Sequence, residues 1–233
     1  MQEKVHRCYN RIGKALKCPF CTRSCIRYGK TGSGKERFRC KACKQTSINN
    51  YTNKAYTVFD ISITCLLKEG CGIRSIGRLL SISVTTVLKR ILSIAKSIEK
   101  PCMSLYKSYE VDEMCTYYQK KSKLLWIVYA LRKDTREVVD FAVGPRNKLT
   151  LQKVTDTLVM SESDRIYTDK LNLYGYIIPE NIHCTAQYSI NHIERKNLSL
   201  WTHMKRLNRR TICFSKSIAM LSACLKIYFW SRE

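Results

Sequence analysis

Three carboxylates stand at positions where they could hold divalent metal ions. Asp112 lies in the middle of an alternating segment typical of a strand, and Asp169 directly follows the short apolar segment 166–168. Glu194 is the only acidic residue between positions 181 and 232. An acidic side chain on a central strand is costly unless it is paired or bound to metal. If neighbouring strands and a helix bring the three together, they could hold two Mg²⁺ or Mn²⁺ ions beside a phosphodiester.

Each of these carboxylates also has a structural interpretation. Glu110 and Glu113 are rivals of Asp112 for the same role, and only the facing of the strand separates Asp112 from Glu113. Asp169 could instead cap a short helix that follows it. Glu194, with two basic residues after it, could be a charge that the dipole favours at a helix start. The residues alone leave these alternatives open.

Two Cys-x-x-Cys pairs indicate a second metal site. With 18 residues between the pairs, the four members are Cys18, Cys21, Cys40 and Cys43. Such pairs supply the four thiolates of a tetrahedral structural Zn²⁺ site. Short strands expected at 27–30 and 36–39, joined by a turn at 31–34, complete a zinc ribbon. The alternatives are that these are ordinary buried cysteines, or that Cys8 or Cys25 replaces one of the four.

The stretch 56–96 is helical by its periodicity. A first helix should turn Val58, Ile61, Cys65 and the pair Leu66-Leu67 inward and end at the glycines of 70–72. A second helix is expected over 73–80, with Ile76, Leu79 and Leu80 inward, and a third over 84–96, capped by Ser83. Two short helices about three residues apart form the helix-turn-helix pattern. The residues that would then face DNA are Arg74, Thr85, Thr86, Lys89 and Arg90. A plain three-helix bundle, serving as a spacer or for dimerisation, is the alternative.

The remainder of the chain has the element order of a ribonuclease H-like fold. Strands are expected at 109–117, 124–131 and 137–144, a helix at 149–160, a strand at 165–168 and helices at 193–207 and 215–230. A turn is expected at 120–122. The predicted fold class is multidomain α+β. A zinc ribbon (1–50) and a helix-turn-helix domain (51–101) precede a ribonuclease H-like α/β domain (102–233) with a mixed sheet.

The charge balance favours a nucleic acid as partner. The chain carries 42 Lys and Arg against 18 Asp and Glu, a formal net charge of +24 in 233 residues. Phosphate neutralisation by such residues supplies most non-specific affinity for DNA. No apolar run could span a bilayer, no secretory signal is visible, and a membrane surface is the weaker alternative. The 13 cysteines are therefore expected in a reducing compartment, where a tight cysteine cluster is a metal site.

Several segments resemble the insertion sequence one (IS1) family of transposases. They read Asp-Glu-Met at 112–114, Val-Gly-Pro-Arg at 143–146, Thr-Asp at 168–169, Ile-Glu-Arg-Lys-Asn-Leu at 193–198, Lys-Arg-Leu at 205–207 and Thr-Ile-Cys-Phe-Ser at 211–215. The amino-terminal half resembles the same family, which places a zinc ribbon and a helix-turn-helix before an Asp-Asp-Glu domain. The similarity covers roughly residues 18–229 and is most specific over 193–215.

The resemblance implies a function and its site residues. Asp112, Asp169 and Glu194 would hold Mg²⁺ or Mn²⁺ for DNA strand cleavage and strand transfer. The last two are separated by 24 residues, as in the family. Zinc would fall on the four paired cysteines. His183 stands where the family tends to have a histidine, and its role is positioning or nothing more. The family usually has an aromatic residue after the second cysteine pair, where this chain has Thr-Ser-Ile at 46–48.

The implied partners are the terminal inverted repeats of an insertion sequence and a target DNA. A basic face on the last part of the chain would follow the DNA backbone, and its members are Arg195, Lys196, Arg206 and Arg209. Its alternative is a solvated charged face. Because two DNA ends must be joined to one target, at least a homodimer is expected. The chain should act in a prokaryotic cytoplasm, at the nucleoid.

Two other functions compete with this interpretation. The chain could be a non-catalytic DNA-binding repressor or an inactive copy of such an element, although all three carboxylates are present. A nuclease acting on RNA is a third and weaker candidate on the same fold.

Overall fold

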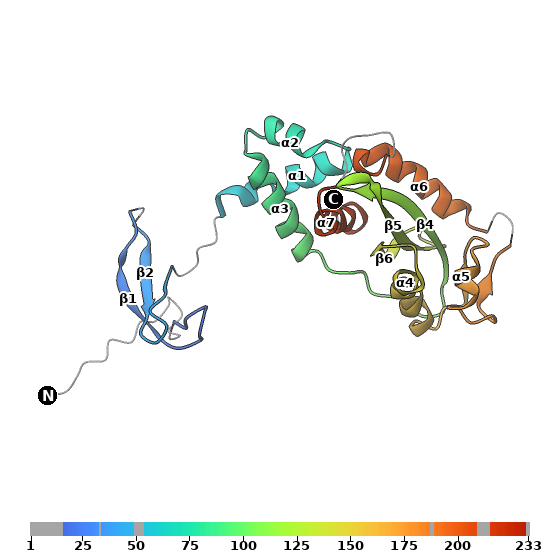
Figure 1. Ribbon diagram of the computed structural model, residues 1–233, viewed down its shortest axis with the longest axis horizontal. Coiled ribbons are helices and arrows are strands. Elements are labelled where there is room, and N and C mark those ends of the chain that lie inside the picture. The colour runs from blue at the N-terminus through green and yellow to red at the C-terminus, as the bar shows by residue number, and fades with distance from the viewer. Residues whose placement is uncertain (1–15, 33, 49–53, 187–188, 209–214, 232–233) are drawn as a thin grey trace. The chain divides into compact units, whose positions relative to one another are not determined.

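The computed structural model of the chain describes residues 16–32, 34–48, 54–186, 189–208 and 215–231 (Figure 1). These residues fall into two compact units, Met1–Ala55 and Tyr56–Glu233. The division into three domains stays a prediction. The structure adds that the second and third predicted parts belong to one compact unit.

The first unit is a three-stranded antiparallel sheet of strands β1 (Cys25–Lys30), β2 (Glu36–Cys40) and β3 (Thr46–Ile48), in that order. The predicted hairpin is confirmed. Strand β3 was not predicted, because a segment of three residues is too short to show a strand pattern in the sequence. The core of this unit is small: Phe38 is its one buried aromatic residue among those described, and cysteines supply most of the rest. So small a core cannot stabilise a fold without a metal or a covalent link.

The second unit begins with helices. A 3-10 helix, η1 (Lys54–Phe59), leads into α1 (Asp60–Lys68), followed by α2 (Ile73–Leu79) and α3 (Val84–Ser97). All three predicted helices are confirmed. The Ser83 side chain accepts a hydrogen bond from the Thr86 backbone N–H at 3.0 Å, so the predicted N-cap is confirmed as well.

The predicted inward face of the first helix is wrong in part. Leu67 is buried, as predicted, but Val58 is 73% exposed, Ile61 is 79% exposed and Cys65 is exposed too. Ile63, which was not predicted inward, is buried instead. Apolar residues line both sides of this helix, so periodicity alone could not choose between them. The packing of α1 against α3 and α7 (Ile218–Trp230) selects the side of Ile63. Of the residues predicted inward on the second helix, Ile76 is buried and Leu80 half-buried, whereas Leu79 is 63% exposed at the end of α2.

Among the described residues of this unit, the strands form one mixed sheet. Its members are β4 (Ser108–Tyr118), β5 (Lys120–Arg132), β6 (Val138–Gly144), β7 (Arg165–Tyr167) and β8 (His183–Cys184), in the order β6-β5-β4-β7-β8. The first three strands are antiparallel, as predicted, and β7 runs parallel to β4. The turn predicted at 120–122 lies at Gln119 instead, which takes φ 59° while Lys120 already belongs to β5.

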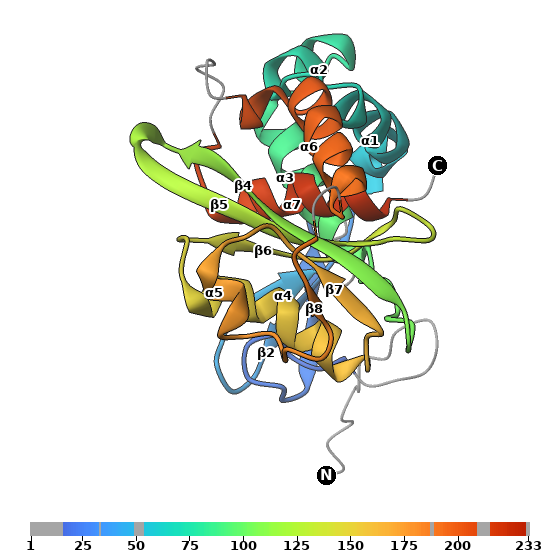
Figure 2. The same ribbon diagram turned by 90° about the vertical axis from the view of Figure 1, so that its right-hand side faces the viewer.

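The other helices cover the two faces of this sheet. They are α4 (Lys148–Met160), α5 (Asn172–Gly175), α6 (Asn191–His203), the 3-10 helix η2 (Lys205–Leu207) and α7. Figure 2 shows α4 and α5 on one face and α6, α7 and the first three helices on the other. The helix predicted at 193–207 is shorter than expected: α6 ends at His203, and the 3-10 helix η2 follows it. The chain is an α+β protein with a mixed sheet.

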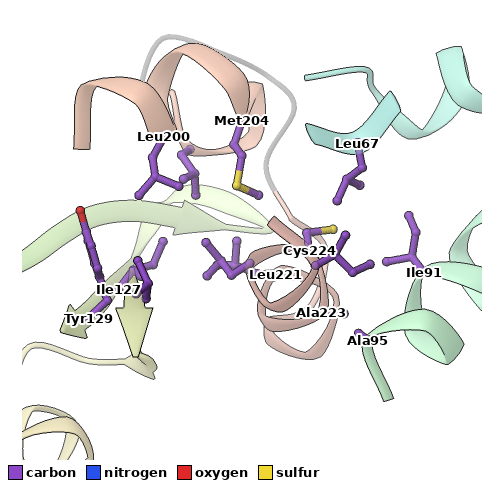
Figure 3. Close-up of a cluster of buried hydrophobic side chains, with 14 of the residues drawn as sticks. Leu67, Ile91, Ala95, Ile127, Tyr129, Leu200, Met204, Leu221, Ala223 and Cys224 are labelled. Atoms are coloured by element: carbon purple, nitrogen blue, oxygen red, sulfur yellow. The ribbon is translucent and has the colours of Figure 1, made fainter. Parts of the chain in front are cut away.

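The core on the α6 side reaches from the sheet to the amino-terminal helices. Leu200 of α6, Ile127 of β5, Cys224 of α7 and Ile91 of α3 belong to one buried cluster (Figure 3). Alternate strand residues such as Val111 face a second cluster under α4. Helices α1 to α3 are thus packed on α7 as part of the same core.

The turn after α1 generates a stability prediction. Gly70 has φ +74°, and a Cβ there would lie 2.5 Å from the backbone carbonyl oxygen of His203. Gly70→Ala should therefore lower the free energy of unfolding by about 2–4 kcal/mol, from backbone strain plus a clash that no side-chain rotation relieves. Gly72→Ala is the control, because its nearest neighbour would be 3.9 Å away and its φ is ordinary.

Tryptophan fluorescence during denaturation measures this difference. Trp126, Trp201 and Trp230 all lie in the second unit, so the signal reports that unit alone. If the two substitutions lowered the free energy of unfolding equally, the close approach of Gly70 to His203 would not be important for stability.

Candidate functional site

The four predicted cysteines converge in the first unit. One ligand atom from each of Cys18, Cys21, Cys40 and Cys43 lies within 4.8 Å of the others. The Cys18 and Cys43 sulfurs are 3.5 Å apart, and those of Cys21 and Cys40 are 3.4 Å apart. Sulfurs at the corners of a tetrahedron around Zn²⁺ lie about 3.8 Å apart. The four sulfurs are therefore spaced closely enough to bind one divalent ion together.

Both cysteine pairs use the same turn. The backbone N–H of Thr22 donates to the Cys18 carbonyl at 2.9 Å, and that of Lys44 to the Cys40 carbonyl at 3.1 Å. Thr22 and Lys44 both take φ 60°, a conformation that non-glycine residues rarely adopt. The repeated turn aims each pair of sulfurs toward the other pair.

Geometry separates the ligands from a bystander in this cluster, because Cys25 lies outside the group of four. Hydrogen bonds, chiefly from the Cys43 backbone N–H, lower the pKa of Cys40 to about 6, which favours the thiolate that metals bind. Burial and hydrogen bonds with the neighbouring cysteines raise the pKa of Cys43 to about 12, and burial and the neighbouring sulfurs raise that of Cys25 to about 11. In the metal-free cluster a raised pKa therefore does not mark a bystander. Cys8, the other alternative, lies outside the described residues.

Two of the three predicted carboxylates lie close together beside the central strand β4. Oxygens of Asp112, Asp169 and Glu113 all lie within 4.8 Å of one another, and we call these three residues the acid cluster. Strand register explains the meeting. Glu110 of β4 pairs with Tyr167, where the parallel strand β7 ends. Asp112 and Asp169 each lie two residues beyond this pair, so they are side by side just past the end of β7.

Asp112 faces the α6 side of the sheet. One of its oxygens accepts a hydrogen bond from the Asn197 side-chain amide at 2.6 Å, and the other from the Glu113 backbone N–H at 2.8 Å. The Tyr129 hydroxyl donates to the Asn197 carbonyl oxygen at 2.7 Å and so fixes that amide. Burial, reinforced by the charges of Glu113 and Asp169, raises the pKa of Asp112 to about 6. The hydrogen bonds that Asp112 accepts therefore do not fully offset its burial and its repulsion from the two neighbouring carboxylates.

The rivals of Asp112 on β4 have hydrogen-bond partners of their own. Glu113 faces the α4 side, where it accepts hydrogen bonds from the Arg146 guanidinium and, at 2.8 Å, from the Tyr174 hydroxyl. Glu110 is fully buried and accepts from the Ile193 backbone N–H at 2.8 Å, and its other oxygen lies 2.7 Å from the His192 ring nitrogen. Glu110 therefore caps the start of α6 and takes no part in the acid cluster.

Glu194 lies outside the acid cluster. It is exposed in the first turn of α6, next to the Ile193 N–H that Glu110 holds and one turn before Asn197. The structure thus ties α6 to β4 on both sides of Glu194 without bringing its carboxylate to the two aspartates. His183 of β8 lies 2.8 Å from the hydroxyl of Thr168, the residue before Asp169, and burial lowers the pKa of its ring.

The predicted DNA-contacting residues of the helices differ in availability. Arg74, Thr85 and Lys89 are exposed. Arg90 is only 18% exposed, and its guanidinium donates to both oxygens of Asp60, which joins α3 to α1. The Thr86 hydroxyl is hydrogen-bonded to that of Ser83 at 2.8 Å. Two of the five candidates are thus committed to contacts within the helices.

The basic residues after Glu194 are also unequal. Arg195 is exposed, whereas burial lowers the pKa of Lys196, whose ammonium group lies 5.7 Å from the centre of the Tyr228 ring. Arg206 donates to the Ser215 hydroxyl at 3.1 Å. Arg209 lies outside the described residues. No helix in the described part of the chain is long and apolar enough to cross a membrane.

Sequence reasoning alone gave no role to several residues of this site. Asn197 and Arg146 stood in the segments that resemble a family, but nothing in their spacing assigned them to Asp112 and Glu113. The hydrogen bond from Tyr174 to Glu113 joins residues 61 positions apart, and no local pattern reports such a contact.

Known proteins match the second half of the chain. Residues 106–231 match the family described as IS1 transposase. The InsB protein of insertion element iso-IS1n from Shigella dysenteriae is 34% identical over 109 residues, which are 47% of this chain and 83% of that protein. InsB of IS1 from Shigella flexneri is 33% identical over 111 residues, 48% of this chain and 85% of that protein. InsB of IS1 2 from Escherichia coli K12 is 32% identical over 109 residues, which are 47% of this chain and 65% of that protein.

Similarity to solved structures is weak. A chain of a simian T-cell lymphotropic virus intasome has a TM-score of 0.38 and 14% identity, covering 70% of this chain and 66% of that chain. So low a score carries no argument about the fold.

The cysteine cluster predicts one bound divalent ion per chain, which we expect to be Zn²⁺. Cys40→Ser should lose this ion, because it removes one of the four thiolates and one whose pKa is lowered. Cys25→Ala should keep it, since the Cys25 sulfur lies outside the group of four. Elemental analysis and release to a chromogenic chelator measure both. A Cys25→Ala protein without metal would place Cys25 among the ligands.

The acid cluster predicts an effect on stability that depends on pH and metal. The ionised Asp112 is disfavoured in the folded chain, so its penalty is absent below about pH 4, grows as pH rises through the interval up to about 6 and is complete at pH 7. In EDTA at pH 7, Asp112→Asn should raise the free energy of unfolding by about 1–3 kcal/mol. At pH 4 the gain should vanish.

Added Mg²⁺ should reverse the order, because it stabilises the wild type and not Asp112→Asn. The control is Asp156→Asn, an exposed position on α4. A metal-free Asp112→Asn protein that is less stable than wild type at pH 7 would show that repulsion among the three acids does not strain the site.

Proposed function

This chain belongs to the IS1 transposase family, and we propose that it binds the terminal inverted repeats of an insertion sequence and catalyses metal-dependent DNA strand cleavage and transfer. Family membership supports a role in transposition. The observation that carries the finer proposal is the acid cluster, which brings together Asp112 and Asp169, two of the three residues to which the resemblance gives catalytic roles.

The donor atoms of the acid cluster suit Mg²⁺ or Mn²⁺. Carboxylate oxygens are the ligands these hard cations prefer, and the raised pKa of Asp112 reflects negative charge that a cation would neutralise. We assign Asp112 and Asp169 as metal ligands. A divalent ion held by these residues would supply an activated water for attack on the phosphodiester and charge stabilisation for the leaving oxygen.

We assign Glu194 as the third ligand, reached from α6. Glu110 and Asp112 pin α6 against β4 on either side of it. Among the described residues, Glu194 has no hydrogen bond or ion pair that would have to break before its carboxylate turned toward the aspartates. The chain then holds metal from both the sheet and the helix, as the resemblance implies.

The same chain would bind DNA over a large basic surface. Its net charge of +24 supplies sequence-independent affinity for phosphate. We infer a zinc ribbon at 1–50, a helix-turn-helix domain at 51–101 with exposed Arg74, Thr85 and Lys89, and a ribonuclease H-like catalytic domain at 102–233. Joining two ends to one target requires at least two protomers. We place this work at the nucleoid of a prokaryotic cytoplasm.

One observation favours a second candidate function. Glu194 is exposed and outside the acid cluster, so the catalytic set is incomplete in this conformation. A DNA-binding repressor, or an inactive copy of the element, would need no third ligand.

Strand cleavage and joining on labelled DNA that carries the element's own ends, in Mg²⁺ or EDTA, tests the proposal. Asp169→Asn and Glu194→Gln should each lower product formation at least 100-fold and leave DNA binding intact, because each removes a metal ligand. Glu180→Gln is the control, an exposed acid away from the cluster.

Three results would contradict parts of this proposal. Full activity of Glu194→Gln would remove that residue from the ligand set. Tight binding of the ends without product in Mg²⁺ or Mn²⁺ would favour the repressor or an inactive copy. Cleavage of RNA without strand transfer would indicate a nuclease.

A further inference from the structure

Arg146 is held in one orientation beside the acid cluster. It follows β6, and its Nε and Nη2 both donate to a single oxygen of Glu113, with the Nε distance 3.0 Å. The guanidinium carbon also lies 4.5 Å from the centre of the Trp126 ring. Trp126 on β5 pairs with Gly144 of β6. The side chain of Arg146 thus crosses from the end of β6 over β5 to β4.

These contacts use only part of the guanidinium. Nε and Nη2 form one donor edge, which Glu113 occupies, whereas Nη1 and Nη2 form a second edge at the tip. Among the described residues, Nη1 has no hydrogen-bond partner. The Arg146 side chain is 39% exposed, while that of Glu113 is 1% exposed. The anchored edge is therefore inside the protein, and donors remain at the accessible tip.

The guanidinium is close enough to the acid cluster to sense it. The hydrogen bonds that Arg146 donates to Glu113 raise the pKa of Arg146, and the charges of Glu113 and Asp169 add to that effect. A permanent cation consequently stands at the rim of the site where the metal-binding carboxylates meet. Its planar fork matches two oxygens of a phosphate group, a geometry that lysine cannot offer.

We propose that Arg146 binds the DNA backbone at the active site, with its Nη1–Nη2 edge on the non-bridging oxygens of a phosphate within a few nucleotides of the cut. Glu113 and Trp126 are positioning residues that hold this edge outward. The inference rests on the proposed function, because it takes DNA as the substrate. It gives Glu113, a rival of Asp112 in the sequence, a different task from metal binding.

The alternative is a purely structural role, in which Arg146 only neutralises the buried Glu113. The two roles differ in what they predict for individual phosphates. A structural arginine changes stability and lowers affinity uniformly, whereas a phosphate contact depends on one or two positions in the DNA.

Duplexes of the element's end, each with one neutral methylphosphonate near the cut, test this difference. Binding is measured in Ca²⁺, so that no cleavage is needed. For wild type, one or two substituted positions should lower affinity about tenfold, the effect of one charge-assisted contact. Arg146→Met should bind unmodified DNA about tenfold more weakly and be insensitive to those positions. Arg146→Lys should fall between the two.

Two controls keep the test independent of folding. Because Arg146→Met leaves a buried carboxylate without its cation, the double variant Glu113→Gln/Arg146→Met is measured beside it and should show the same insensitivity. Arg136→Met, an exposed arginine in the β5–β6 turn, should keep the wild-type pattern. Unfolding curves verify that each variant is folded.

The outcomes separate this proposal from the proposed function. If no methylphosphonate affects wild type, or if Arg146→Met and the double variant keep the wild-type pattern, the phosphate contact is wrong whether or not the chain cleaves DNA. If the pattern depends on Arg146 but wild type makes no product in Mg²⁺ or Mn²⁺, the contact stands and the catalytic proposal falls.

Discussion

The burial of negative charge on β4 is the constraint on which the second unit depends. Glu110, Asp112 and Glu113 lie within four consecutive positions of a central strand, and each would be costly there without partners. Their partners come from elements far along the chain: the start of α6, its Asn197, and the Arg146 and Tyr174 side chains near α4 and α5. Satisfying three carboxylates thus fixes helices on both faces of the sheet, and the same placement builds the site.

The sequence predicted what local rules control. Ser83 predicted the start of α3, the spacing of the cysteines predicted their cluster, and the alternation of apolar residues predicted β4. It failed where two faces were equally apolar, so that Ile61 was placed inside when Ile63 is buried. It left Asp112 and Glu113 unresolved, because their different tasks come from partners on different elements. The position of Glu194 relative to the aspartates was not predictable either, since it follows from how α6 docks.

The two candidate metal centres place opposite demands on the chain. The cysteine cluster occupies the middle of its own small core, so a bound ion would contribute to folding itself. The acid cluster lies on the central strand β4, where the neighbouring strand β7 ends, and the two large cores are complete without it. Protein contacts hold Asp112 and its neighbours together despite their repulsion, so two of the three proposed ligands are in place before a metal ion binds, whereas Glu194 is not.

Helices α1 to α3 share a core with the sheet through α7, and this has a consequence for the DNA that the chain would select. If α3 lies on DNA as proposed, no flexible joint separates the bases it reads from the bond that is cut. The protein then acts as a ruler of fixed length. The recognised bases must lie at a constant number of base pairs from the element's tip, and half a helical turn inserted between them would put the scissile phosphate on the wrong side of the duplex.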